Sequence, residues 1–302
     1  MAEFDLHEKQ AAFTPNFAPI PLEYVPEGVR VIKDVPYGTH DLQKLDLYLP
    51  ESSSPPPVLI EFHGGGWRNG DKQQLGVYKG LIEKVLEAGI AVVAVNYRLT
   101  PEFPWPAQAE DSVRSIQFVR SKADEWNLDP SRVVLIGGSA GAHLSLWIAM
   151  HDDFAKPDSG DPVERQSSRV SGAIDCWGPP DMTHVNLEGR AEAIFTQFFR
   201  CRPQEWDSPR VRELRKHSSP VTYIRPGGPP VLIIHDQPEK PLPKEPTWTI
   251  SDGHSSIWGA MLRSRLQEAR IPVESLFSAT PETWTPAAIR FLHSCFATNK
   301  DL

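Results

Sequence analysis

Ser139 is the residue whose surroundings most directly suggest chemistry. It lies at the centre of residues 137–141 (GGSAG), which follow a β-branched apolar run and precede an apolar stretch. Glycines on both sides let a strand and a helix meet in a sharp turn, which leaves the serine hydroxyl exposed. A serine hydroxyl is a weak nucleophile until a base accepts its proton. The pattern therefore predicts a nucleophile and raises the question of its base.

A second glycine-rich turn lies upstream at residues 63–66 (HGGG), directly after another apolar run. Three successive glycines permit a backbone whose N–H groups converge on one point, as stabilisation of an oxyanion requires. Either turn alone fits a glycine loop that only assists packing. Both turns together, each after a predicted strand, favour acyl-transfer chemistry.

Composition excludes several classes of partner. The chain has 302 residues, 40% of them hydrophobic, and a net charge of −8. This charge argues against nucleic acid and anionic membrane surfaces, and no apolar run is long enough to span a bilayer. The first residues are polar and acidic and lack a secretion signal, so we expect a cytoplasmic protein. The three cysteines, 176, 201 and 295, are widely spaced and form no metal-binding pattern.

Strand-like and helical segments alternate along most of the chain, which predicts an α/β fold with a mostly parallel, doubly wound sheet flanked by helices. We expect an N-terminal arm at 1–28 and one domain at 29–302 that includes a helical insertion at about 178–218. The strands expected are 29–35, 45–48, 57–62, 90–95, 133–136, 170–176, 230–235 and 273–277. The helices expected are 77–88, 107–126, 142–150, 191–199, 209–216, 254–268 and 286–296.

From about residue 29 to 296 the chain resembles the α/β-hydrolase superfamily. More narrowly, it resembles the esterase and lipase branch with an HGGG motif, which includes hormone-sensitive-lipase-like and feruloyl- or acetyl-xylan-esterase-like enzymes. The matching segments are 63–67 (HGGGW), 96–99 (NYRL), 105–107 (WPA) with Asp111, 137–141 (GGSAG), 219–221 (SPV) and 229–235 (PPVLIIH). The resemblance implies that Ser139 is the nucleophile and that the N–H groups of Gly65, Gly66 and Ala140 form the oxyanion hole.

The base departs from the family pattern. The family histidine follows the last strand, where this chain has Pro281. His63 and His143 lie inside the motifs and are expected to be structural. Of the histidines further along, His293 belongs to the predicted closing helix. His254 begins a predicted helix at the ligand edge of the sheet, from which it either reaches Ser139 or remains a partly exposed helix-start residue.

The family acid follows the strand that ends at about residue 235, in a loop that here reads HDQPEKPLP. By spacing, Glu239 takes the position of the acid and Asp236 that of a glycine. A glutamate can orient a histidine as an aspartate does. Glu239 is therefore either the acid of the catalytic group or a solvated loop carboxylate.

Two functions from different classes remain. The first is a serine carboxylic-ester hydrolase that acts on small or short-acyl esters through an acyl-enzyme, with weak activity because the expected histidine is missing. The second is a non-catalytic protein of the same fold that binds a small molecule, with Trp67, Trp105 and Trp177 as candidate pocket residues. Neither function requires a cofactor or a metal.

Overall fold

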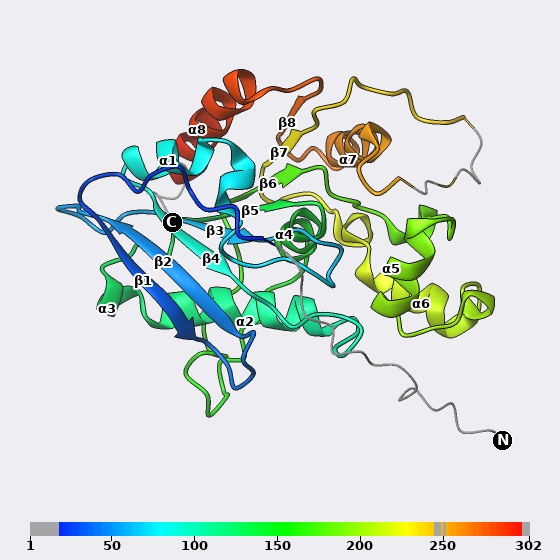
Figure 1. Ribbon diagram of the computed structural model, residues 1–302, viewed down its shortest axis with the longest axis horizontal. Helices are drawn as coiled ribbons and strands as arrows, with labels where there is room; N and C mark the ends of the chain where they lie inside the picture. The colour runs from blue at the N-terminus through cyan, green and yellow to red at the C-terminus, as the bar shows by residue number, and fades with distance from the viewer. Residues whose placement is uncertain (1–17, 245–248, 250–251, 298–302) are drawn as a thin grey trace.

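The computed structural model describes residues 18–244, 249 and 252–297, so residues 1–17 of the predicted arm lie outside the described part. An eight-stranded sheet with the order β1-β2-β4-β3-β5-β6-β7-β8 forms the centre of the molecule (Figure 1). The strands are β1 (Val29–Pro36), β2 (Lys44–Pro50), β3 (Val58–Phe62), β4 (Ala91–Val95), β5 (Val133–Gly138), β6 (Gly172–Cys176), β7 (Val231–Ile234) and β8 (Val273–Leu276).

Strand direction divides the sheet into two parts. β1 pairs with β2, and β2 with β4, in antiparallel fashion, whereas every pairing from β4 through β8 is parallel. Parallel neighbours need crossover connections, and helices supply them here. The predicted mostly parallel α/β fold is therefore confirmed.

Helices cover both faces of the sheet (Figure 1). The helices α1 (Leu81–Glu87) and α8 (Pro281–Ala297) pack on one face, whereas α2 (Ala107–Ser121), α3 (Ala123–Trp126), α4 (Ala140–Met150) and α7 (Ser256–Glu268) pack on the other. Because both faces are covered, β3 and β4 are buried at every position. This explains why β4 reads as a continuous apolar run, and why β3 does so apart from the buried Glu61, rather than as alternating sequences.

The predicted insertion at 178–218 contains α5 (Arg190–Phe198) and α6 (Pro209–Ser218), which lie to one side of the sheet (Figure 1). The short 3-10 helices are η1 (Leu75–Tyr78), η2 (Met182–His184), η3 (Pro203–Glu205) and η4 (Pro220–Tyr223). Among the described residues no helix is long and apolar enough to cross a membrane.

Two predicted helices are each divided in the structure. The segment 77–88 separates into η1 and α1 around Gly80, whose φ of 86° is in the left-handed region. The segment 107–126 separates into α2 and α3 at Lys122. Apolar spacing is nearly unchanged across such a break, so a pattern of buried residues predicts one continuous helix.

The starts of α8 and α7 also differ from the prediction. The closing helix begins at Pro281 rather than at 286, because proline is tolerated in a first helical turn and Pro286 is accommodated inside the helix. The helix α7 begins at Ser256, where the Ser255 side chain accepts a hydrogen bond from the N–H of Ile257. His254 therefore precedes the helix and lies in a turn.

Candidate active site

The turn between β5 and α4 holds Ser139 in a conformation that few residues adopt. Its φ is 55° and its ψ is −114°, and its N–H donates to the carbonyl oxygen of Cys176 at 2.8 Å. A Cβ atom on Gly137 would lie 2.1 Å from the carbonyl carbon of Gly141, and one on Gly141 would lie 1.7 Å from the oxygen of Phe62. Strand and helix can therefore approach this closely only because both residues are glycine.

The imidazole of His254 lies against this serine. Its Nε2 is 2.8 Å from Oγ of Ser139, although 115 positions separate the two residues along the chain. This distance is within the range that a general base and a nucleophile require. The histidine comes from the connection between β7 and α7, not from the segment after β8.

The glycine loop after β3 lies beside the same serine. A Cβ atom on Gly64 would lie 3.7 Å from Cβ of Ser139. Gly65 and Gly66 have φ values of 106° and 62°, which favour glycine. Within the described part of the chain, the N–H groups of Gly65, Gly66 and Ala140 donate no hydrogen bond to another residue. These donors therefore remain available near Ser139.

The two histidines inside the motifs make their hydrogen bonds elsewhere. Nδ1 of His63 donates to the oxygen of Gly64 at 2.7 Å, and the His63 ring stacks on Tyr97 at 4.3 Å. Nε2 of His143 donates to the oxygen of Ser218 at 2.7 Å. Burial lowers the pKa of both His63 and His143 to about 4, so both rings are neutral at pH 7. This placement fits the structural roles expected of them.

The carboxylates predicted by spacing do not contact the His254 ring. The guanidinium of Arg263, on α7, binds Glu239 through two hydrogen bonds, one of them 3.2 Å from Nη1 to Oε2. Asp236 is exposed. Among the described residues, no hydrogen bond joins either carboxylate to the imidazole of His254. The structure therefore brings Ser139 and His254 together, whereas Glu239 pairs with Arg263.

Two further residues contact the turn that carries His254. Oδ1 of Asp252 accepts the His254 N–H at 3.0 Å, and the indole Nε1 of Trp258 donates to the Asp252 carbonyl at 3.1 Å. Sequence reasoning missed both residues. An aspartate two positions before the histidine is a known turn signal that was available in the sequence, whereas nothing local indicates Trp258.

Side chains from two other segments surround the serine turn. Ile194 of α5 lies 3.6 Å from the position of a Cβ atom on Gly66, so the insertion covers the glycine loop. The indole of Trp177 lies 3.8 Å from the corresponding position on Gly138. Trp67 and Trp105 are buried, 2% and 4% exposed, within the aromatic core. Of the three tryptophans suggested as pocket residues, Trp177 thus lies beside the turn, whereas the other two are packed.

A buried carboxylic acid lies on β3, the strand that leads into the glycine loop. Glu61 is 1% exposed and accepts a hydrogen bond from the phenol of Tyr78 at 3.1 Å. Burial raises the pKa of Glu61 to about 8, so the group is protonated at pH 7. The Tyr78 hydroxyl also lies 4.0 Å from the position of a Cβ atom on Gly138, so the phenol that contacts the serine turn is bonded to a neutral acid.

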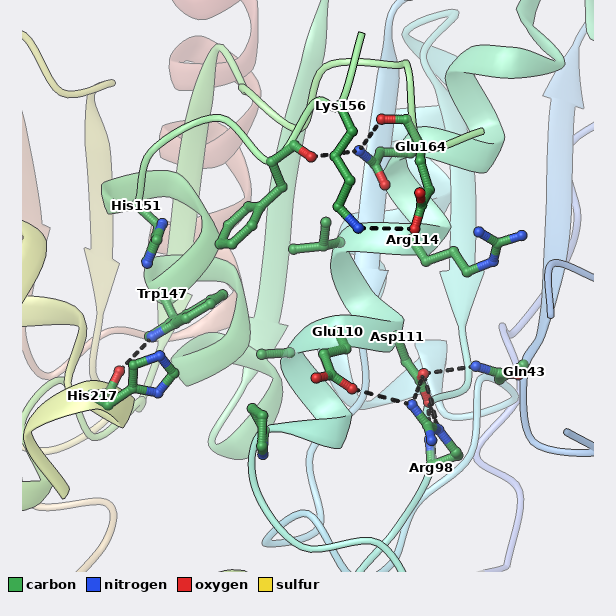
Figure 2. A pocket seen from close by; sticks show the side chains of 15 residues that line it. Gln43, Arg98, Glu110, Asp111, Arg114, Trp147, His151, Lys156, Glu164 and His217 are labelled. Atoms are coloured by element: carbon green, nitrogen blue, oxygen red, sulfur yellow. Dashed lines mark hydrogen bonds and ion pairs between the residues drawn. The ribbon is translucent and has the colours of Figure 1, made fainter. Parts of the chain in front are cut away.

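A separate cavity of about 540 Å³ lies between α2 and the C-terminal half of α4 (Figure 2). Trp147, His151 and His217 form one side of it, and residues of α2 form the other. Its cations are neutralised in pairs, for example Lys156 with Glu164 at 3.0 Å. Neither Ser139 nor His254 is among its lining residues, so this cavity is distinct from the serine cluster.

The strand order, the strained serine turn and the glycine loop together define an α/β-hydrolase fold. Residues 45–251 match the BD-FAE family model, and the chain belongs to the BD-FAE family. Two solved structures have the same fold. A truncated carbohydrate esterase from gut microbiota is 22% identical, with a TM-score of 0.73 over 92% of this chain and 99% of its own. Esterase B from Lactobacillus rhamnosis is 19% identical, with a TM-score of 0.69 over 92% and 89% of the two chains.

Curated relatives match shorter regions. Esterase LipQ of Mycobacterium tuberculosis is 30% identical over 215 residues, which cover 70% of this chain and 49% of the relative. The kynurenine formamidase of Danio rerio is 35% identical over 158 residues, which cover 52% of this chain and 50% of the relative. The chain thus spans about half the length of these curated relatives.

Proposed function

We propose that this protein is a serine carboxylic-ester hydrolase that acts on small or short-acyl esters. The observation that carries the proposal is the distance of 2.8 Å between Nε2 of His254 and Oγ of Ser139. Membership of the BD-FAE family and the esterases among the relatives support the same reaction class.

In the first half of the reaction, His254 accepts the hydroxyl proton at Nε2 while Oγ of Ser139 attacks the ester carbonyl carbon. The carbonyl oxygen becomes an oxyanion that accepts hydrogen bonds from the N–H groups of Gly65, Gly66 and Ala140. Collapse of this intermediate breaks the bond to the alcohol, which leaves with the proton from His254. The product is an acyl ester on Ser139.

In the second half, His254 removes a proton from water as the water oxygen attacks the acyl carbon. Collapse returns the proton to Oγ of Ser139 and releases the carboxylic acid. With no described carboxylate bound to its ring, His254 works as one half of a dyad. We therefore expect turnover below that of a complete triad, in which the third member aids orientation and charge stabilisation.

A fluorophosphonate probe and p-nitrophenyl acetate test this mechanism. The wild type is expected to be labelled at Ser139 and to release nitrophenol faster than the Ser139→Ala variant, whose fold is checked by circular dichroism. Equal turnover by the two proteins, together with no labelling of the wild type, would remove the proposal.

The alternative is a non-catalytic protein that binds a small molecule beside Ser139. Pro281, where the family has its histidine, favours it. This alternative predicts that esters, acids or phenols raise the melting temperature of the wild type without turnover or probe labelling. If these compounds leave the melting temperature unchanged and the protein hydrolyses esters, the non-catalytic alternative is wrong.

A further inference from the structure

The proposed base lies in a tight turn outside regular secondary structure. His254 is exposed and lies just before α7, whose N-cap is Ser255. An exposed histidine samples several rotamers unless its backbone is fixed and its ring has a partner. The neighbouring contacts therefore decide how long the ring remains near Ser139.

Asp252 closes the turn from within. Its Oδ1 accepts the N–H of His254 at 3.0 Å, which is the two-residue side-chain turn that aspartate and asparagine both form. The carbonyl oxygen of Asp252 accepts the N–H of Ser255 at 3.2 Å. Both ends of Asp252 thus restrain the main chain on either side of His254.

Trp258 ties the same turn to the core. Its ring is 1% exposed, and its indole N–H donates to the Asp252 carbonyl at 3.1 Å. On the other side, Oγ of Ser256 donates to the carbonyl of Pro238 at 2.7 Å, which connects α7 to the segment after β7. The turn is therefore anchored at the packed face of α7 and at the edge of the sheet.

We infer that Asp252 and Trp258 are positioning residues that hold His254 at Ser139 through the main chain. The side chain of Asp252 serves as a hydrogen-bond acceptor for the turn, so its negative charge is not required. This inference rests on the proposed function, because it concerns the base of that reaction.

The role assigned to Asp252 differs from that of a triad acid. A triad acid accepts a hydrogen bond from the histidine ring, which fixes the tautomer of the ring and stabilises its charge, and replacement of that acid by its amide lowers kcat by about 10⁴-fold in the best-studied case. Here the hydrogen bond of Asp252 goes to the backbone N–H of His254. An asparagine supplies the same acceptor oxygen without charge, whereas an alanine supplies none.

Three variants separate these roles. Asp252→Asn is expected to keep kcat within about 3-fold of wild type, because the turn survives. Asp252→Ala and Trp258→Phe are expected to lower kcat by about 10–100-fold with little change in KM, since a displacement of about 1 Å costs up to 10²-fold. The control is Trp126→Phe, which replaces a different tryptophan of the same core cluster. Trp126 belongs to α3 and not to the His254 turn, so this variant is expected to leave kcat unchanged.

A second readout does not depend on activity. The amide proton of His254 is expected to exchange slowly, measured by NMR, in the wild type and Asp252→Asn, and faster in Asp252→Ala. If Asp252→Asn loses as much kcat as Asp252→Ala, the charge matters and the inference is wrong. If Asp252→Ala has the same kcat and the same amide exchange as the wild type, the inference is also wrong. Because Asp252 is exposed, this variant tests the inference even if Trp258→Phe fails to fold.

Failure of the proposed function gives a different result. In that case Ser139→Ala and His254→Ala would both match the wild type in ester turnover, while the exchange data would still report whether Asp252 holds the turn. If His254→Ala is inactive but Asp252→Ala is fully active, the proposed hydrolase function is supported and the positioning role of Asp252 is wrong.

Discussion

The two connections that meet at Ser139 are built in opposite ways. The β5–α4 turn is fixed by main-chain packing, since Gly137 and Gly141 lie where any Cβ atom would overlap neighbouring backbone. The β7–α7 connection presents His254 from an exposed turn, held by one side-chain acceptor and one indole. The glycines that backbone packing requires are visible in the sequence, whereas the contact of Trp258 with the His254 turn has no local sequence signal. This difference separates what could be predicted from what could not.

Removal of the imidazole tests the exposed connection with the largest expected effect. His254→Ala is expected to lower kcat by about 10³–10⁴-fold, because Ser139 loses its proton acceptor. Steady-state hydrolysis of p-nitrophenyl acetate measures this, with the melting temperature expected to be unchanged. The control His293→Ala alters an exposed histidine of α8 and is expected to retain full activity. Equal activity of the two variants would show that the exposed connection takes no part in the reaction.

A methyl group on the glycine loop tests the packed side of the site. Gly65→Ala places a Cβ atom 2.2 Å from the oxygen of Asn69 at a φ of 106°, so the backbone that carries the Gly65 N–H must shift. We expect kcat to fall by about 10²–10³-fold, as when an oxyanion donor is lost. The matched control is Gly227→Ala, which has a φ of 85° but no atom within 4 Å of the new Cβ. If both variants lose kcat to a similar extent, backbone strain alone explains the loss and the role of the glycine loop in the reaction is not supported.

The buried acid on β3 gives a prediction for stability. Its pKa is raised by burial from 4.5 to about 8. Between about pH 4.5 and 8 native Glu61 therefore keeps a proton that the unfolded chain has already released, and the free energy of unfolding falls as pH rises through this window. Glu61→Gln has no such proton and is expected to be more stable than wild type by about 1–3 kcal/mol at pH 7.

Urea denaturation at pH 5 and pH 8 measures that difference. The stabilisation by Glu61→Gln should be larger at pH 8 than at pH 5, since the wild type loses stability between the two. A difference between variant and wild type that is the same at both values would mean that Glu61 is ionised in the folded protein throughout.

The smallest effect is expected at the loop carboxylate. Glu239→Gln removes the ion pair with Arg263 but no contact with His254. A half-exposed ion pair contributes about 0–1 kcal/mol, and kcat should remain within about 3-fold of wild type. A loss of kcat as large as that of His254→Ala would instead identify Glu239 as the acid of a complete triad and contradict the dyad.

Much of the fold was accessible from the sequence because its determinants are local. Apolar runs marked the buried strands, and the glycines marked the two turns beside Ser139. The breaks at Gly80 and Lys122 escaped because the apolar spacing continues across them. Boundaries of this kind depend on how the chain packs in three dimensions.

The residues of the candidate site also differ in how far the sequence could predict them. His254 could be named as a candidate from its place near the sheet edge, but its distance to Ser139 required the structure. Glu239 was selected by spacing alone, and no pattern in the chain indicates that Arg263, one helix away, binds it. Asp252 was overlooked because its side chain accepts a hydrogen bond from the backbone N–H of His254, whereas a triad acid is expected to bond the imidazole ring.

The segment after β8 passes from Leu276 to α8 at Pro281 without carrying an imidazole. In a survey that classes relatives by the residue at that alignment column, this chain would be counted among the inactive ones. Yet the imidazole of His254, from the connection between β7 and α7, lies 2.8 Å from the Ser139 hydroxyl. A candidate base can therefore come from a different loop than the one in which a sequence alignment expects it, and an interatomic distance reveals it where the residue at one alignment position does not.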